Sequence, residues 1–290
     1  MRNVNPHLQV NKIPALKKEK IVSQTFTEIK VEDQVATLAL NRTKSMNALS
    51  LAFAEEITNS IRSLNERDDV RAIIILSNAA GFCAGMDLKD FKSLGLIGGT
   101  AKDTFFFHDK ARPLFDCCNV MEECRKPVIA AVHGVCVGGG LDLISACDIR
   151  LCTEDATFSI KEAALGFVAD MGVLQRLPHI IGQGYTREMA YTARFYTASE
   201  VEKMGLVNNV YPDKETLFAE ARKLARLIAA NPPMAVMGTK EVINYSRTSS
   251  IADGMLKAIE KNTLFMTSQD LLEAVTAFTE KRKPVGSAHC

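Results

Sequence analysis

The sequence has 290 residues, enough for one large domain or for a domain with an appendage. Apolar residues make up 47% of the chain and charged residues 24%, which is ordinary for a soluble globular protein. The formal net charge is only +1, so the charge balance gives no reason to expect binding to nucleic acid or to a membrane surface. No apolar run approaches the roughly 18 residues that a membrane-spanning helix needs.

The eight cysteines are scattered, with no CxxC pair and no Cys/His spacing typical of zinc. Several stand in apolar stretches such as ISACDIRLC, where a free thiol behaves as a small buried hydrophobe. We therefore expect reduced cysteines in a reducing compartment and no metal site.

Residues 1–25 carry several lysines and no acid before Glu19. An organellar presequence would also lack acids, but it would be richer in Arg and Ser and more amphipathic. The composition favours a basic, flexible N-terminal arm. The chain ends in SAHC, which is not a peroxisomal SKL-type signal.

Strand and helix patterns alternate through the first two thirds of the chain. FTEIKV and VATLALN, within residues 26–41, predict two short strands, and residues 50–67 have helical periodicity. RAIIILS from Arg71, KPVIAAVHG ending at Gly134, and CDIRLCT predict three apolar strands that are buried on both faces. This order indicates an α/β fold with right-handed crossovers.

Beyond about Gly182 the patterns are almost entirely helical. REMAYTARF, ASEVEKMG, KETLFAEARKLARLIAA, MAVMGTKEVINYS, ADGMLKAIEKNTLFM and LLEAVTAFTEKRK all predict helices. Their apolar faces are large for the end of one chain, which favours packing against a partner subunit.

Two glycine clusters each follow a predicted strand. GFCAGMDL, residues 81–88, leads into a polar helix, and HGVCVGGGLDL, residues 133–143, leads into an apolar one. Small residues let a ligand approach the backbone, and a helix N-terminus offers unpaired N–H groups. Two such turns side by side could form an oxyanion hole. The clusters match neither the dinucleotide nor the P-loop pattern, and alone they could merely permit tight turns.

These clusters, in this order and with the segments around them, resemble the crotonase (enoyl-CoA hydratase/isomerase) superfamily. The similarity runs from Phe26 to Pro284 and includes NRTKSMNALS, LQRLPHIIG, ASEVEKMGLVNNVYP and AFTEKRKP. It implies a ClpP/crotonase-like spiral of ββα units with a helical C-terminal trimerisation region. It implies the ranges 1–25 for the arm, 26–205 for the spiral core and 206–290 for oligomerisation.

The resemblance also implies the chemistry. The N–H groups of Met86 and Gly139 would hold the thioester oxygen of an acyl-coenzyme A, because an enolate needs fixed donors in a dry site. Asp142, Glu162 and Asp170 would carry protons. On the residues alone, each acid also has a structural interpretation: Asp142 and Glu162 suit the first turn of a helix, and Asp170 suits the N-cap of MGVLQRL.

Hydratases of the superfamily carry glutamates at the first two acidic positions, and Asp142 departs from that pattern. Asp142, Glu162 and Asp170 together resemble the Δ3,5-Δ2,4-dienoyl-CoA isomerase subfamily. By that resemblance Asp170 is the base at C2, Glu162 the acid at C6 and Asp142 an auxiliary acid, in the β-oxidation of unsaturated fatty acids. The alternatives are an enoyl-CoA hydratase, a Δ3-Δ2-enoyl-CoA isomerase and, more remotely, a non-catalytic binding protein of this fold.

Coenzyme A binding is expected, by the same resemblance, at the turn around residues 44–48, at the two glycine turns and at a C-terminal AFxEKR. The residues concerned are Lys44, Met46, Ala48, Ala84, Gly85, Asp87, Leu88, Gly138, Phe278 and Lys281. The EKRK segment could instead be a solvated basic tail.

No cofactor is expected, since coenzyme A is part of the substrate. The expected partners are the acyl-CoA and further copies of the chain, in a trimer or a dimer of trimers, with no nucleic acid and no membrane span. The expected location is mitochondrial or peroxisomal (or glycosomal) in a eukaryote and cytoplasmic otherwise.

Overall fold

A computed structural model describes residues 21–23, 25–95 and 98–282 of the chain. Most of the expected N-terminal arm and residues 283–290 lie outside the described residues. The first described strand, β1 (Ile21–Ser23), pairs antiparallel with β2 (Thr27–Glu32). Sheet structure therefore begins inside the segment that the sequence assigned to a flexible arm.

The main sheet has seven strands in the order β1-β2-β3-β4-β5-β7-β10. After the antiparallel pairs β1–β2 and β2–β3, the strands from β3 to β10 run parallel. The remaining members are β3 (Val35–Leu40), β4 (Ala72–Ser77), β5 (Val128–Val132), β7 (Ile149–Thr153) and β10 (Asn209–Tyr211). A second sheet joins β6 (Val135–Val137), β8 (Thr157–Ser159) and β9 (Tyr196–Thr197). The α/β fold predicted from the sequence is confirmed.

The expected burial of the central strands on both faces is confirmed. All six residues of β4 and all five of β5 are buried. On β4, Ile73 and Ile75 face the larger core, whereas Ile74 and Leu76 face the opposite side, as a period of two requires. One continuous apolar run of β4 therefore packs against the cores on both faces of the sheet.

The larger core lies under α1 (Leu51–Asn65), α4 (Phe107–Glu123) and α5 (Gly139–Ser145). The other face is covered by α9 (Lys214–Ala229), whose buried positions recur every four residues and are mostly alanines. Small side chains let a helix lie close to a sheet. Since α9 and β10 belong to residues 206–290, the range expected for oligomerisation contributes directly to the main sheet layer.

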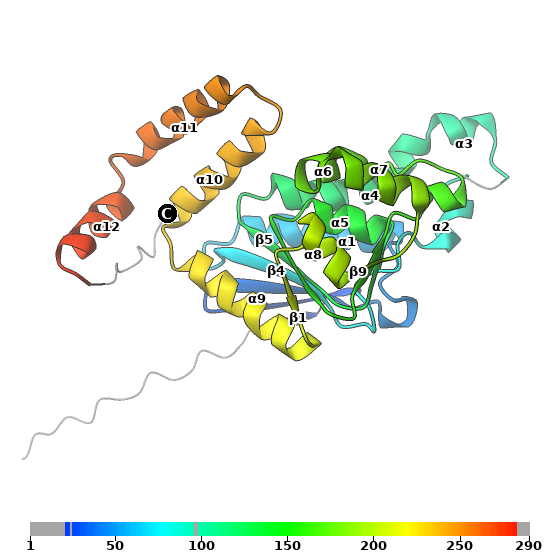
Figure 1. The fold of residues 1–290 in the computed structure, drawn as a ribbon, viewed down its shortest axis with the longest axis horizontal. Helices are drawn as coiled ribbons and strands as arrows, with labels where there is room; N and C mark the ends of the chain where they lie inside the picture. Colours follow the sequence, from blue (N-terminus) through cyan, green and yellow to red (C-terminus); the bar gives the residue numbers. More distant parts are fainter. Residues whose placement is uncertain (1–20, 24, 96–97, 283–290) are drawn as a thin grey trace, which may run out of the picture.

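Shorter helices connect these layers. They are η1 (Thr43–Ser45), α2 (Leu88–Ser93), α3 (Ala101–Phe105), η2 (Glu162–Leu165), α6 (Val173–Ile180), α7 (Gly182–Thr192) and α8 (Ala198–Met204). The last three helices are α10 (Pro233–Ser246), α11 (Ile251–Phe265) and α12 (Gln269–Thr279). Figure 1 shows α10 to α12 extending away from the α/β body as an arm. The helical end of the chain is as the sequence predicts.

Candidate active site

The first part of the site is the turn that begins at η1. Met46 and Asn47 have positive φ values of 48° and 54°. The buried Asn47 amide donates to Ser77 Oγ (2.7 Å) and to the Phe82 carbonyl (2.9 Å). These bonds offset the cost of the left-handed backbone and fix the turn to the end of β4.

The glycine turn after β4 lies directly against this first turn. The Leu49 N–H donates to the Gly85 carbonyl (2.7 Å), and the Asp87 N–H donates to the Leu49 carbonyl (2.9 Å). Successive N–H groups of extended backbone point to opposite sides, so the Met86 N–H points away from Leu49. Within the described residues it has no backbone acceptor. Arg42 Nη2 adds an ion pair to Asp87 (3.0 Å).

The second glycine turn differs from expectation in one respect. The short strand β6 separates β5 from α5, so the turn follows β6 rather than the longer apolar strand. Gly138 has φ 51°, and its N–H donates to the Ser159 carbonyl (3.0 Å). Gly139 is the first residue of α5; its N–H therefore has no acceptor within the helix.

The two glycine turns lie side by side. A Cβ on Gly85 would lie 3.2 Å from the Val137 carbonyl oxygen and 3.8 Å from Gly138 Cα. A Cβ on Gly138 would lie 3.7 Å from Gly85 Cα and 3.0 Å from Glu162 Oε1. Side chains at either glycine would fill the space between the turns. The residues after them, Met86 and Gly139, therefore present their N–H groups from neighbouring turns.

Asp142, in the first turn of α5, is almost completely buried, with 1% exposure. Its Oδ1 accepts the Val173 N–H (2.7 Å), so the carboxyl group caps the start of α6. Burial, and next the nearby Glu162 carboxylate, raises the pKa of Asp142 to about 8, although the Val173 N–H acts in the opposite direction. Asp142 thus joins two helices, and the negative charges of Glu162 and Asp170 act on it.

Glu162 is the first residue of η2 and is also buried. Its Oε1 faces Gly138, where a Cβ would lie 3.0 Å from this oxygen, and its Oε2 has no hydrogen-bond partner among the described residues. Burial raises its pKa above the usual glutamate value. An unpartnered carboxyl oxygen beside a glycine turn is suited to exchange a proton with a bound molecule.

Asp170 lies after η2 and before α6, and it is not the helix cap that the sequence allowed. The N-cap residue is Gly172, and the Val173 N–H is taken by Asp142 instead. Asp170 is exposed and lines a cavity of about 370 Å³ together with Phe115. Surrounding protein atoms nevertheless raise its pKa, and its own backbone N–H and then His108 partly offset this rise.

His108 is a residue that the sequence analysis missed. It lies on α4, outside every motif of the resemblance, and its ring centroid is 6.1 Å from that of Phe115. A histidine following three phenylalanines carries no recognisable signal by itself. Only the packing of α4 against the Asp170 segment brings it near the site.

The residues expected to bind coenzyme A divide into two groups. Those of the first group belong to the three neighbouring turns, and the Ala84 N–H donates to the Met46 carbonyl (2.9 Å). Lys44, Ala84 and Leu88 are exposed there. Phe278 and Lys281 belong to the end of the arm, where Phe278 is 86% exposed. Figure 1 shows α12 far from α2, so one chain does not bring the two groups together.

A sequence model for enoyl-CoA hydratase/isomerase matches residues 30–287. The chain belongs to the enoyl-CoA hydratase/isomerase family. A peroxisomal Δ3,5-Δ2,4-dienoyl-CoA isomerase of Arabidopsis thaliana is 42% identical over 87% of this chain and 92% of its own length. A mitochondrial protein of the same name from Homo sapiens is 40% identical over 87% of this chain and 78% of its own.

Solved structures of the enoyl-CoA hydratase/isomerase family share the fold. An enoyl-CoA hydratase from Bacillus anthracis has a TM-score of 0.81 with 31% identity, covering 94% of this chain and 100% of its own. The crotonase spiral expected from the sequence is thereby confirmed.

Nowhere in the described ranges do three or more His, Cys, Asp or Glu side chains gather in a way that could hold a metal ion. In the same part of the chain, none of the helices combines the length and apolarity needed to cross a membrane.

Proposed function

We propose that the protein isomerises 3,5-dienoyl-CoA to 2,4-dienoyl-CoA in the β-oxidation of unsaturated fatty acids. The relatives named as dienoyl-CoA isomerases are 36–42% identical to this chain, and a relative named as a probable enoyl-CoA hydratase is 35% identical. The observation that carries the proposal is the difference in environment among the three carboxyl groups. One is a buried helix cap, one is buried with a free oxygen, and one faces an open cavity.

The thioester oxygen is bound between the N–H groups of Met86 and Gly139. Removal of a proton from C2 places negative charge on this oxygen, and two fixed backbone donors stabilise that charge in a site with little water. The contacts of Leu49 with both sides of Met86 hold the first donor in place. The N-terminus of α5 holds the second.

Proton transfer is divided between two carboxyl groups. Asp170 removes the C2 proton as a carboxylate, and Glu162 supplies a proton to C6 as the neutral acid. The raised pKa of Glu162 favours the protonated form that this step needs. After each turnover, Asp170 holds a proton and Glu162 lacks one, so both return to their starting states by exchange with solvent.

Asp142 is the feature that argues against a hydratase. Hydratases of the family resemble one another in carrying glutamates at both positions that share the attacking water, whereas this chain carries the shorter Asp142 at the first. Asp142 is 1% exposed and gives Oδ1 to the Val173 N–H. In this proposal it is an auxiliary acid, neutral near pH 7 because of its raised pKa, that limits the negative charge beside the dienolate.

Coenzyme A lies along the first turn and the glycine turns, through Lys44, Met46, Ala48 and residues 84–88, with Gly138 beside the thioester. Phe278 and Lys281 contact it from a neighbouring subunit, because in one chain they lie at the end of the arm. The reaction needs no cofactor beyond the coenzyme A of its substrate. The relatives named mitochondrial or peroxisomal support one of these organelles as the location.

The test is an assay of 3,5-dienoyl-CoA and crotonyl-CoA side by side with the purified protein. We expect the absorbance of the 2,4-dienoyl product to rise with no cofactor added and crotonyl-CoA to be hydrated far more slowly. Efficient hydration of crotonyl-CoA with no change in the diene would assign the chain to the hydratases instead.

A further inference from the structure

The segment that carries Asp170 is held by Arg176 of α6 in addition to Asp142. The guanidinium of Arg176 is buried and donates through Nη1 to the Met171 carbonyl (3.2 Å). Its other nitrogens reach α4, where Nε donates to Glu122 Oε2 (2.9 Å) and Nη2 to Asn119 Oδ1 (2.7 Å). One side chain therefore connects the residue next to Asp170 with α4.

Gly172 shows how closely this guanidinium packs on the backbone. A Cβ at Gly172 would lie 1.9 Å from Arg176 Nη1, and the residue has φ 111°. No other residue type would allow the same approach. The backbone from Met171 to Val173 is thus held by the Arg176 guanidinium at Met171 and Gly172 and by the Asp142 carboxyl group at Val173.

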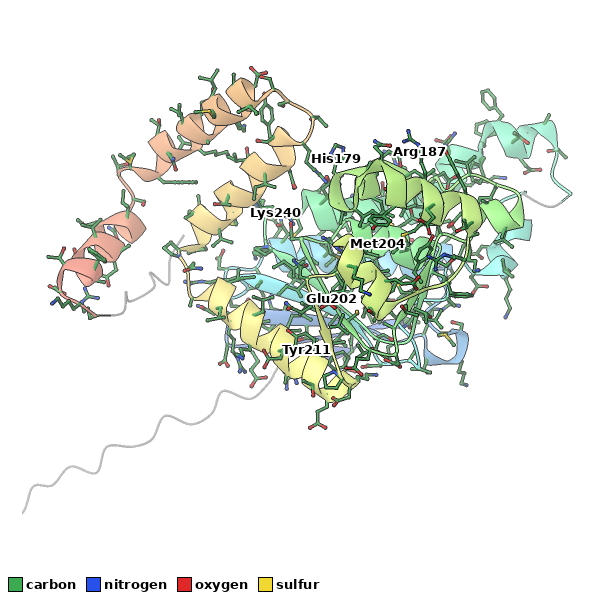
Figure 2. All side chains as sticks on the ribbon, in the orientation of Figure 1. His179, Arg187, Glu202, Met204, Tyr211 and Lys240 are labelled. Carbon is green, nitrogen blue, oxygen red and sulfur yellow. The ribbon has the colours of Figure 1, made fainter. Side chains whose placement is uncertain are left out.

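Glu122 extends the connection to the arm. Its Oε1 forms an ion pair with Arg247, the residue directly after α10, and its backbone carbonyl accepts from the Asn244 amide (3.2 Å). The same end of α4 also receives Lys240, whose buried Nζ donates to the Met121 carbonyl (2.9 Å). Figure 2 shows Lys240 between α10 and the body of the molecule.

The cavity at Asp170 lies along this chain of charges. This cavity has a volume of about 370 Å³, and its lining includes Asp170, Glu122, Arg176 and Arg247. The residue that follows α10 and the segment that carries Asp170 therefore border the same cavity. A carboxylate between two guanidinium groups resists displacement, because moving any one of them leaves a partly buried charge without its partner.

We infer that Arg176, Glu122 and Arg247 are positioning residues for Asp170, and that they transmit the placement of the α10–α12 arm to this base. The inference rests on the proposed function, in which Asp170 removes the C2 proton. A base must lie within hydrogen-bond reach of the carbon-bound proton, and a displacement of about 1 Å can cost about a hundredfold in rate.

The test compares the full-length wild type with Arg247→Gln, Glu122→Gln and Arg176→Lys, and with Arg226→Gln as a matched control. Arg226 also forms a two-residue ion pair, with Asp33 (3.0 Å), but this pair joins α9 to the β2–β3 turn. We expect Arg247→Gln to lower kcat about tenfold, with KM for the dienoyl-CoA changed by less than about twofold. The rate of C2 deuterium exchange should fall by the same factor, and Arg226→Gln should match the wild type.

A double-mutant cycle between Arg247→Gln and Arg176→Lys checks the connection. If both act through Glu122, the second substitution should add little to the first. A purely structural role would lower the melting temperature while leaving kcat and C2 exchange of the folded enzyme unchanged. Unchanged values in both Arg247→Gln and Glu122→Gln, or full additivity in the cycle, would overturn the inference. Wild-type turnover of the diene in the same assay tests the proposed function separately.

Discussion

At the residue scale, the carboxyl groups of Asp142, Glu162 and Asp170 differ in burial and in hydrogen bonding because their surroundings differ. The oxygens of Asp142 are buried and one is bonded to an N–H, those of Glu162 are buried with one free, and Asp170 faces solvent. In all three cases nearby protein atoms that displace water raise the pKa, and at Asp170 they do so although part of the side chain is exposed. Composition and spacing could suggest these acids, but they could not rank their burial.

The raised pKa of Asp142 makes the stability of the folded protein depend on pH. Its pKa is about 8 in the folded chain and close to the ordinary 3.8 when unfolded, so the folded state binds the proton more tightly. Protonation of Asp142 therefore stabilises the folded state, and this stabilisation is fully present below the unfolded pKa. It is lost as pH rises through about 8, at up to about 1.4 kcal/mol per pH unit. Asp142→Asn should remove this loss while still accepting the Val173 N–H.

Thermal unfolding of both proteins from about pH 5 to pH 9 measures the effect. The melting temperature of the wild type should fall relative to that of Asp142→Asn as pH rises. Parallel curves for the two proteins would show that Asp142 ionises in the folded state much as it does in the unfolded chain.

Several features of the site were predictable from sequence at this scale and others were not. The glycine turns and the acids follow local motifs, and the structure places Gly85, Gly138 and Glu162 together. His108 and the helix-capping contact of Asp142 depend on how α4, α5 and α6 pack. Contacts between elements far apart in sequence leave no local pattern.

At the element scale, the start of α6 depends on a single glycine. The left-handed backbone of Gly172 and the Arg176 guanidinium against it leave no room for a side chain. Gly172→Ala should cost about 1–3 kcal/mol of stability and lower turnover, because the segment with Asp170 must move.

Gly184→Ala is the matched control for this substitution. Gly184 lies inside α7, and a Cβ there would meet nothing within 4 Å. Alanine should therefore stabilise the helix by up to about 1 kcal/mol. Denaturant unfolding measures the stability of the two variants, and the isomerase assay measures their turnover. Equal stability for both variants would contradict the role given to Gly172.

Long periodic elements such as β4, α1 and α9 could be predicted from sequence because their apolar positions repeat along their length. β6 has only three residues and follows β5 after two residues, so its pattern merges with that of the preceding strand. β1 lies beside a basic segment that obscured it. Short strands depend on their partners more than on their own composition.

At the scale of the whole molecule, the arm presents apolar surface that the chain itself leaves exposed. Large apolar side chains are exposed along α11 and α12, including Ile251, Met255, Leu256, Ile259, Leu272, Val275 and Phe278. A patch of this kind marks an interface. It also agrees with the proposal that Phe278 and Lys281 serve the site of a neighbouring subunit.

We therefore expect a particle of three or six chains in solution at micromolar concentration. Light scattering with size-exclusion chromatography measures its mass directly. Polar substitution of Leu256 and Leu272 should shift the mass downward, whereas substitution of the exposed Tyr191 on α7 should leave the trimer intact. A wild-type monomer would contradict this assignment of the arm.

The central claim is that proton removal at C2 and proton return at C6 belong to different carboxyl groups, Asp170 and Glu162. Asp170→Asn and Glu162→Gln should each lower turnover by about two to four orders of magnitude. Since Asp170 does not cap α6, the nearly isosteric asparagine should not disturb the helix.

Deuterium exchange at C2 of the bound acyl-CoA in heavy water distinguishes the two roles most directly. Asp170→Asn should abolish exchange, because no base remains to form the dienolate. Glu162→Gln should retain exchange, because only the return of a proton to C6 is blocked. Near-normal turnover and exchange in Asp170→Asn, or loss of exchange in Glu162→Gln alone, would contradict this assignment of the two roles.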